Sequence, residues 1–396
     1  MTQRARSIAP TPGLPWNRVD ETPRATAGAL PAEATARTVA RARGASKRIH
    51  FVDLLRLIAS VQMIHGHTMN ALMADDLRHG TLYQNWTWAR GLVSVAFMVA
   101  AGLSFHLSTL ARFEKHKADR RKVIARFRRA GWLILLGYLL HFPAAIFVGG
   151  EVGPALREFA YVDVLQCIGV CILVLQALTM LCSDPKTVVR ASFVIAVGCF
   201  ALAPLGETVS PEGPWRWLIN YVTHQGGSLF PLLPWAGFVF AGVVVADVAL
   251  PQGVRTTKDP LPRLALCTAA VLGIWAVAEL VPFTLVTDET SRNSHPAFNV
   301  LKLGLVLAIT TGLAVVGKGI TRLPRWAEVL AGESLSLYVS HLLVLYIGGI
   351  GLYRLYGHSL DLATSMTVAI VMIVLTLLFG LLFHRHKVWR KARWGW

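Results

Sequence analysis

The segment from Phe51 to Met73 constrains the fold more than any other part of the chain. It is long and apolar enough to cross a bilayer as a helix, yet it contains Asp53, Arg56 and His67. Ionisable side chains are costly in hydrocarbon, and in a spanning helix they usually face the protein interior and mark a functional site. The sequence therefore predicts that this helix carries part of a site.

The spacing of these side chains predicts that they share one face of the helix. From Arg56 to His67 the rotation is about 1100°, three turns plus about 20°, and from Asp53 to His67 it is within about 40° of whole turns. Arg56 and His67 are about 16 Å apart along the axis. A simpler alternative is that Asp53 and Arg56 only neutralise each other as a local ion pair, and that His67 is a packed core residue.

The composition of the chain predicts further membrane-spanning helices outside this segment. The 396 residues are 54% hydrophobic and only 15% charged. We expect an all-α fold, a polytopic bundle of about ten transmembrane helices. The predicted spans are residues 51–73, 89–110, 130–149, 160–182, 189–206, 228–249, 262–283, 298–316, 329–350 and 363–384.

Charge in the connections predicts orientation and domain limits. Lys and Arg gather in alternate connections, above all in 111–129, and at the two ends, so the net charge of +17 indicates topology and not binding to nucleic acid. Both termini are then cytoplasmic, with Arg56 near the cytoplasmic face and His67 towards the outer face. We expect a disordered basic cytoplasmic tail over 1–46, a membrane domain over 47–386 and a basic cytoplasmic tail over 387–396.

Other polar residues within or beside the spans are candidates for the same site. Asp163 and Gln166 share a face at the start of the fourth span, where they either cap the helix or orient the histidine of the first span. His341, inside the ninth span, is either functional or buried by packing. Arg90, at the start of the second span, either binds an acidic or sugar acceptor or extends its charge to the interface. No zinc-ligand spacing is present in the sequence, and we expect no metal.

The segment that opens the sixth span has two readings. Phe230 to Trp235 contains two prolines, which fit a helix start with an interfacial Trp, and it could instead line a cavity for an acceptor. His224, in the connection before this span, is a weaker candidate.

An ordered series of motifs resembles the catalytic domain of the heparan-α-glucosaminide N-acetyltransferase family, which has many bacterial members. The Arg56-x10-His67 spacing also resembles the signature of the acyltransferase-3 family. The motifs are Asp53-x-x-Arg56 with Met63 and His67, Phe97–Gly102, Arg126-x-x-Arg129-x-x-x-Leu133, Asp163–Gly169 and Pro231–Trp235.

The resemblance implies a transmembrane acyltransferase of a bacterial inner membrane. An acyl group, which we expect to be acetyl as in this family, would pass from cytosolic acyl-CoA to an amine or hydroxyl of an amino sugar or glycan on the outer side. His67 would be the catalytic base with Asp163 as its orienter. The candidate substrate-binding residues are Asp53, Arg56, Arg90, Gln166 and His341.

Several alternatives stay open at the level of sequence. The base could be His79 or His341 instead of His67, and the route could be direct transfer or an acyl-histidine intermediate. The chain could be a cell-surface polysaccharide O-acyltransferase of the acyltransferase-3 type, or a membrane transporter without chemistry. The oligomeric state is open, with a homodimer as one option.

Overall fold

The computed structural model describes residues 49–143, 146–147, 149, 151–213, 215–250, 259–280, 293–320, 322–346 and 351–394. The chain from Lys47 onward forms one compact unit. The predicted tail over 1–46 lies outside the described residues, so its disorder stays a prediction.

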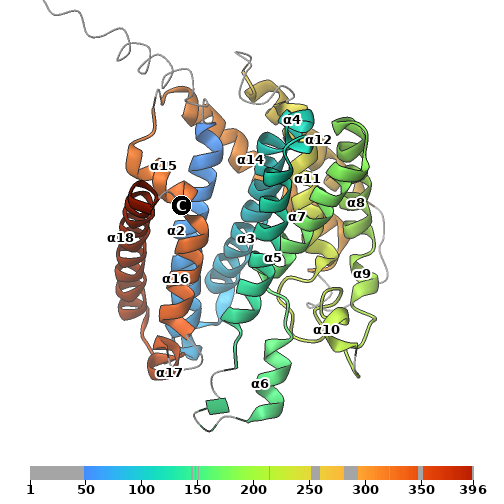
Figure 1. Cartoon of the computed structure of the whole chain (residues 1–396). Coiled ribbons are helices and arrows are strands. Elements are labelled where there is room, and N and C mark those ends of the chain that lie inside the picture. The colour runs from blue at the N-terminus through green and yellow to red at the C-terminus, as the bar shows by residue number, and fades with distance from the viewer. Residues whose placement is uncertain are drawn as a thin grey trace, which may run out of the picture. The chain divides into compact units, whose positions relative to one another are not determined.

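This unit is built from helices (Figure 1), which confirms the predicted all-α class. Over the described ranges there is no strand, only a single bridge between Met73 and Leu360. The α-helices are α2 (His50–Leu72), α3 (Gly80–Ser108), α4 (Phe113–Lys117), α5 (Arg120–Leu140), α6 (Val152–Phe159), α7 (Val164–Leu181), α8 (Pro185–Ala201), α9 (Ala203–Gly206), α10 (Arg216–Ile219), α11 (Leu232–Ala249), α12 (Leu261–Ala278), α14 (Pro296–Lys318), α15 (Arg325–Gly332), α16 (Ser334–Tyr346), α17 (Leu352–Tyr356) and α18 (Leu362–Trp394).

Every predicted span overlaps at least one of these helices, but fewer helices meet the requirements of a membrane span. Within the described part of the chain, six helices are long and apolar enough to cross a membrane, or seven if α15 and α16 form one bent span. The helix α2 is not among the six, and its polar side chains lower its hydropathy. The expected count of about ten spans therefore stays a prediction.

Several helices begin at residues whose side chains bond the first turn. Asp119 precedes α5 and accepts a hydrogen bond from the Lys122 amide at 3.2 Å. Asp184 precedes α8 and accepts from the Thr187 amide at 3.0 Å, with Pro185 at the first helical position. Such caps satisfy backbone donors that have no partner inside the helix, and they fix where these helices start.

The packing of α3 against α11 depends on two glycines. A Cβ atom at Gly102 of α3 would collide with the backbone of Val239 and Val243, and one at Gly242 of α11 would collide with the backbone of Val99. Small residues let two helix backbones approach this closely. The same helix α3 also packs against α2, which in turn packs against α16 and α18.

Two helices present apolar side chains to the surroundings. In α12, Leu266 and Val277 are 66% and 64% exposed, and in α18, Leu375 and Leu382 are 57% and 65% exposed. Large apolar surfaces of this kind are unfavourable in water and suit contact with lipid. The chain is accordingly an integral membrane protein.

The predicted ninth span, 329–350, is broken in the structure. The helices α15 and α16 meet at Glu333 with a bend of 70°. The Glu333 carboxylate accepts hydrogen bonds from His384 Nδ1 at 2.9 Å and from Lys387 Nζ at 3.2 Å, both on α18. The helix α18 continues to Trp394, through most of the predicted C-terminal tail. This arrangement holds α16, and with it His341, beside α2.

Candidate active site

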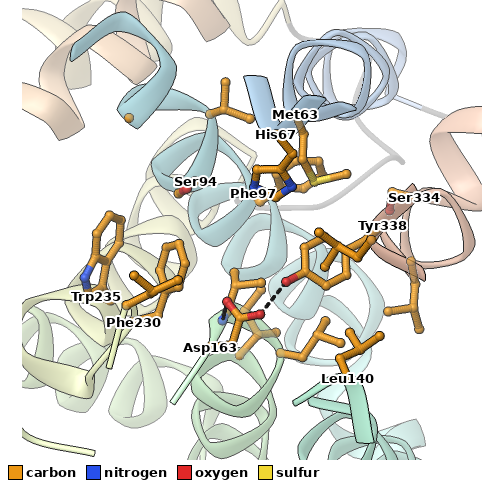
Figure 2. Close-up of a pocket in the computed structure, with 18 of the residues that line it drawn as sticks. Met63, His67, Ser94, Phe97, Leu140, Asp163, Phe230, Trp235, Ser334 and Tyr338 are labelled. Atoms are coloured by element: carbon orange, nitrogen blue, oxygen red, sulfur yellow. Dashed lines mark hydrogen bonds between the residues drawn. The ribbon is translucent and has the colours of Figure 1, made fainter. Parts of the chain in front are cut away.

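A large cavity of about 1690 Å³ brings most of the predicted site residues together. Helices α2, α3, α5, α7, α14 and α16 all contribute to its wall. Figure 2 shows His67 and Met63 on one side of this cavity, Trp235 and Phe230 on another, and Tyr338 bonded to Asp163. Its polar and aromatic lining residues include Arg56, His67, Arg90, Ser104, Ser108, Arg126, Arg129, His141, Asp163, His224, Phe230, Trp235, Lys302 and Tyr338.

One face of α2 contributes both a charged end and a histidine end to this cavity. Arg56, Met63, His67 and Asn70 all line it, as the helical spacing predicts for Arg56 and His67. His65 lies off this face and packs edge-on against the Trp86 ring, with ring centroids 6.2 Å apart. Arg56 and His67 are therefore exposed to one continuous space.

The other two candidates near this helix lie elsewhere. Asp53 is not among the described residues that line the cavity. His79, the alternative base, is exposed just before α3 and is likewise absent from the lining.

His67 and His341 form a hydrogen-bonded pair in the core of the site. His67 Nδ1 and His341 Nε2 are 2.8 Å apart, and His341 Nδ1 lies 2.7 Å from the Leu337 carbonyl oxygen. A carbonyl only accepts, so His341 Nδ1 carries the proton of that bond and its Nε2 accepts from His67 Nδ1–H. In this neutral arrangement, His67 Nε2 keeps its lone pair. The pair thus leaves one nitrogen of His67 able to accept a proton.

Asp163 has a structural role and a second role within the cavity. Its side chain caps α7 through the Val164 amide at 2.7 Å, as part of a capping box with Gln166. Its other oxygen accepts a 2.6 Å hydrogen bond from the Tyr338 hydroxyl. The Tyr338 ring in turn lies edge-on to the His67 ring, with centroids 6.5 Å apart. Asp163 therefore reaches His67 through Tyr338, and no hydrogen bond between Asp163 and His67 is found among the described residues.

Gln166 lies inside the helix cap and is fully buried. Its Oε1 accepts from the Asp163 amide at 3.2 Å, and its Nε2 lies 3.3 Å from the Tyr161 carbonyl oxygen. It is not among the described lining residues. For Gln166, the contacts therefore support a role in capping the helix.

Sequence reasoning missed a second histidine in the cavity. His141, at the end of α5, places Nε2 3.5 Å from Asp163 Oδ2 and lines the same space. A histidine beside a carboxylate is a familiar arrangement of a general base with its orienter. No spacing in the sequence connects His141 to Asp163, because they meet only when α5 packs against α7.

The Arg56 end of the cavity is rich in guanidinium groups held by hydroxyls. Arg56 donates to the Ser104 hydroxyl. Arg126 Nη2 donates to Ser108 Oγ and Thr109 Oγ1, each at 2.9 Å. Arg129 also lines this end. Guanidinium groups bind phosphate and carboxylate oxygens with paired hydrogen bonds, so this end can bind an anionic group.

Arg90 lies nearer the histidine end, where the backbone of α2 fixes its position. Its Nη1 donates to the Gly66 carbonyl at 3.2 Å, and its guanidinium lies over the Trp86 ring at 5.0 Å from the ring centroid. Arg90 lines the cavity with most of its donors left for other groups. Across the described ranges, no group of three His, Cys, Asp or Glu side chains could hold a metal ion.

A comparison with protein families gives this arrangement a context. Residues 48–278 match the model of the heparan-alpha-glucosaminide N-acetyltransferase catalytic domain. This match covers more than half of the chain. The chain belongs to this family.

Membership of the family identifies the chain as a transmembrane acetyltransferase. The match includes Arg56, His67, Arg90, His141 and Asp163, and ends before Tyr338 and His341. The search of curated proteins found no match. The relation to the acyltransferase-3 family stays a prediction.

Proposed function

We propose that the chain transfers an acetyl group from cytosolic acetyl-CoA to an amine or hydroxyl of a sugar on the opposite side of the membrane. The observation that supports this most strongly is that Arg56 and His67 line one cavity from the same face of α2. They lie about 16 Å apart along the helix axis, too far to act on one atom. An extended pantetheine arm is long enough to connect a phosphate group near Arg56 with a thioester near His67.

The basic end would hold the CoA moiety. Arg56, Arg126 and Arg129 offer guanidinium groups to its phosphates, and the Ser104 and Ser108 hydroxyls keep two of these groups in place. Arg90 would contact the acceptor at the other end.

The transfer would proceed by direct attack of the acceptor. The lone pair of the acceptor nitrogen or oxygen attacks the thioester carbonyl carbon, and His67 Nε2 takes the proton from the same acceptor atom. The new C–N or C–O bond forms, the C–S bond breaks, and the CoA thiolate leaves and receives the proton from His67. His341 acts as a positioning residue, since its Nε2 holds the His67 Nδ1–H. An acyl-histidine route would use the same Nε2 as nucleophile.

Acetylation of an enclosed acceptor would test this function against transport. Purified protein in proteoliposomes receives acetyl-labelled acetyl-CoA, with D-glucosamine on the other side. We expect acetylated glucosamine to form and CoA to be released in equal amounts. Movement of unmodified label across the bilayer, with no acetylated sugar and no CoA, would favour a transporter instead.

Labelling of cysteines in intact cells tests the proposed sidedness. Glu212 and Lys115 are both exposed, and they lie in connections of opposite predicted side. In a cysteine-free background, Glu212→Cys should react with an impermeant thiol reagent and Lys115→Cys should not. The reverse result would place acetyl-CoA on the wrong side of the cavity.

A further inference from the structure

Among the lining residues that the structure describes, four have a buried side-chain polar atom without a hydrogen-bond partner: Thr87, His141, His224 and Trp235. Two of these atoms are Trp235 Nε1 and His224 Nε2. Both residues line the cavity that also contains His67. A buried polar group without a partner costs about 1–3 kcal/mol, so these two atoms together indicate a place where a ligand supplies the missing bonds.

The two atoms have complementary character. The His224 Nδ1–H donates to the Ser228 carbonyl oxygen at 2.9 Å, which leaves Nε2 as an acceptor. Burial lowers the pKa of His224, so the neutral ring is favoured. The indole N–H of Trp235 can only donate. A donor and an acceptor that line the same cavity suit a ligand with hydroxyl groups, since a hydroxyl both accepts and donates hydrogen bonds.

Aromatic surface lies beside these atoms. The Phe230 and Trp235 rings pack with centroids 4.7 Å apart, and Lys302 Nζ lies 5.7 Å from the centroid of the Trp235 ring. Flat apolar surface with a few polar atoms at its edge is typical of pockets for ring-shaped polar ligands. A sugar ring has both features, apolar C–H faces and hydroxyls at its edge.

Backbone contacts tie this part of the wall to the proposed catalytic histidine. The Val162 amide donates to Ser228 Oγ at 3.0 Å, and the Phe230 amide donates to the Val162 carbonyl at 3.0 Å. The next residue, Asp163, is bonded to Tyr338, which packs on His67. Figure 2 shows Trp235 and Phe230 across the pocket from Tyr338, with His67 beside the same space.

We propose that Trp235 and His224 form a hydroxyl-binding subsite that orients a sugar ring of the acceptor toward His67. This inference rests on the proposed function and adds how the acceptor is recognised. The indole N–H donates to one ring hydroxyl, and that hydroxyl donates to His224 Nε2.

Deoxy sugars test the subsite directly. The acetylation rate and KM of D-glucosamine are compared with those of its 3-deoxy, 4-deoxy and 6-deoxy analogues, in wild type and in Trp235→Phe. For wild type, kcat/KM should be about tenfold or more lower with one analogue than with D-glucosamine, because the missing hydroxyl leaves buried groups of the protein unpaired. Trp235→Phe keeps an aromatic side chain but lacks the indole N–H, and it should lose most of that discrimination. His224→Phe removes the ring nitrogen that accepts the hydrogen bond from the sugar hydroxyl, and it should lose the same discrimination as Trp235→Phe.

Controls and contrary outcomes separate the subsite from the proposed function. Trp215→Phe, at an exposed position outside the cavity lining, should keep the wild-type preference. Equal treatment of all analogues by wild type, or full discrimination in Trp235→Phe, would overturn the subsite while leaving acetyl transfer intact. If no sugar is acetylated, equilibrium binding of the same four sugars replaces the rates. The same preference in binding would support the subsite even though the proposed acetyl transfer had failed. The absence of sugar binding would overturn the subsite.

Discussion

The two ends of the cavity differ in charge, although one face of α2 contributes to both. At the Arg56 end, guanidinium groups are bonded to serine and threonine hydroxyls. At the His67 end, two imidazoles are bonded to each other, and the Asp163 carboxylate is bonded to the Tyr338 hydroxyl. Fixed positive charge suits the binding of an anion, whereas a neutral histidine suits proton transfer. Under the proposed function, one helix therefore sets the distance between a group that binds the donor and a group that moves a proton.

Removal of His67 should have the largest effect on this comparison. In His67→Ala the base is lost, and acetyl transfer should fall by about 10²–10⁴-fold, with acetyl-CoA affinity almost unchanged. The rate is measured with purified protein and labelled acetyl-CoA. The matched control is His65→Ala, on the same helix but outside the cavity lining. Activity within a few-fold of wild type would transfer the role to His141 or His341.

Removal of His341 should have a smaller effect at the same end. His341→Ala leaves His67 Nδ1–H without its acceptor, so the ring and its tautomer are no longer fixed. We expect kcat to fall about tenfold or more, less than for loss of the base itself, with partial recovery in His341→Asn, whose amide oxygen also accepts. A rise in KM for acetyl-CoA with kcat unchanged would contradict a positioning role and indicate substrate binding.

At the other end, Arg56→Ala should weaken binding and spare chemistry. Loss of a charge-assisted hydrogen bond should raise the free energy of CoA binding by about 1.5–3 kcal/mol. Arg56→Lys should recover only part of this, since an ammonium lacks the planar fork. Calorimetric titration of CoA measures the change, with Arg112→Ala as the control, because Arg112 is exposed and outside the cavity lining. Unchanged CoA affinity in a folded Arg56→Ala protein would leave Arg56 a structural residue.

The smallest effect is expected from His141. In His141→Ala, Asp163 keeps its bonds to the Val164 amide and to Tyr338, so the capped helix and the Tyr338 contact should persist. We expect activity to fall by less than about tenfold, which is a smaller loss than removal of the base itself would cause. A loss equal to that of His67→Ala would make His141 and Asp163 the base and its orienter.

Much of the fold follows from local rules that sequence contains. Helical periodicity is sufficient to place Arg56 and His67 on one side of α2, and apolar runs are sufficient to locate the helices. The break at Glu333 was missed, although Gly332, Glu333 and Ser334 interrupt the apolar run at that point. The contacts that Glu333 makes there come from His384 and Lys387, which lie more than fifty positions further along the chain and could not be foreseen from the local sequence.

The site was less accessible to sequence reasoning, because its contacts join distant segments. Asp163 was predicted to orient His67, yet the side chains that contact its carboxylate are those of Tyr338 and His141. His341 was a candidate on burial alone, and only the packing of α16 on α2 reveals its bond to His67. Trp235 was interpreted first as an interfacial anchor. Its unpartnered indole N–H is a property of the folded cavity and leaves no pattern in the sequence.

The contact between His67 and His341 also has a consequence for any shortened version of the protein. The family match ends at residue 278, but Tyr338 and His341 lie beyond it, on a helix whose angle is held by α18. A fragment cut at the end of the match would retain Arg56, His67 and Asp163 and still lose the imidazole that fixes the tautomer of His67. Under the proposed function, the smallest unit able to support the chemistry would therefore extend through α18, beyond the end of the family match.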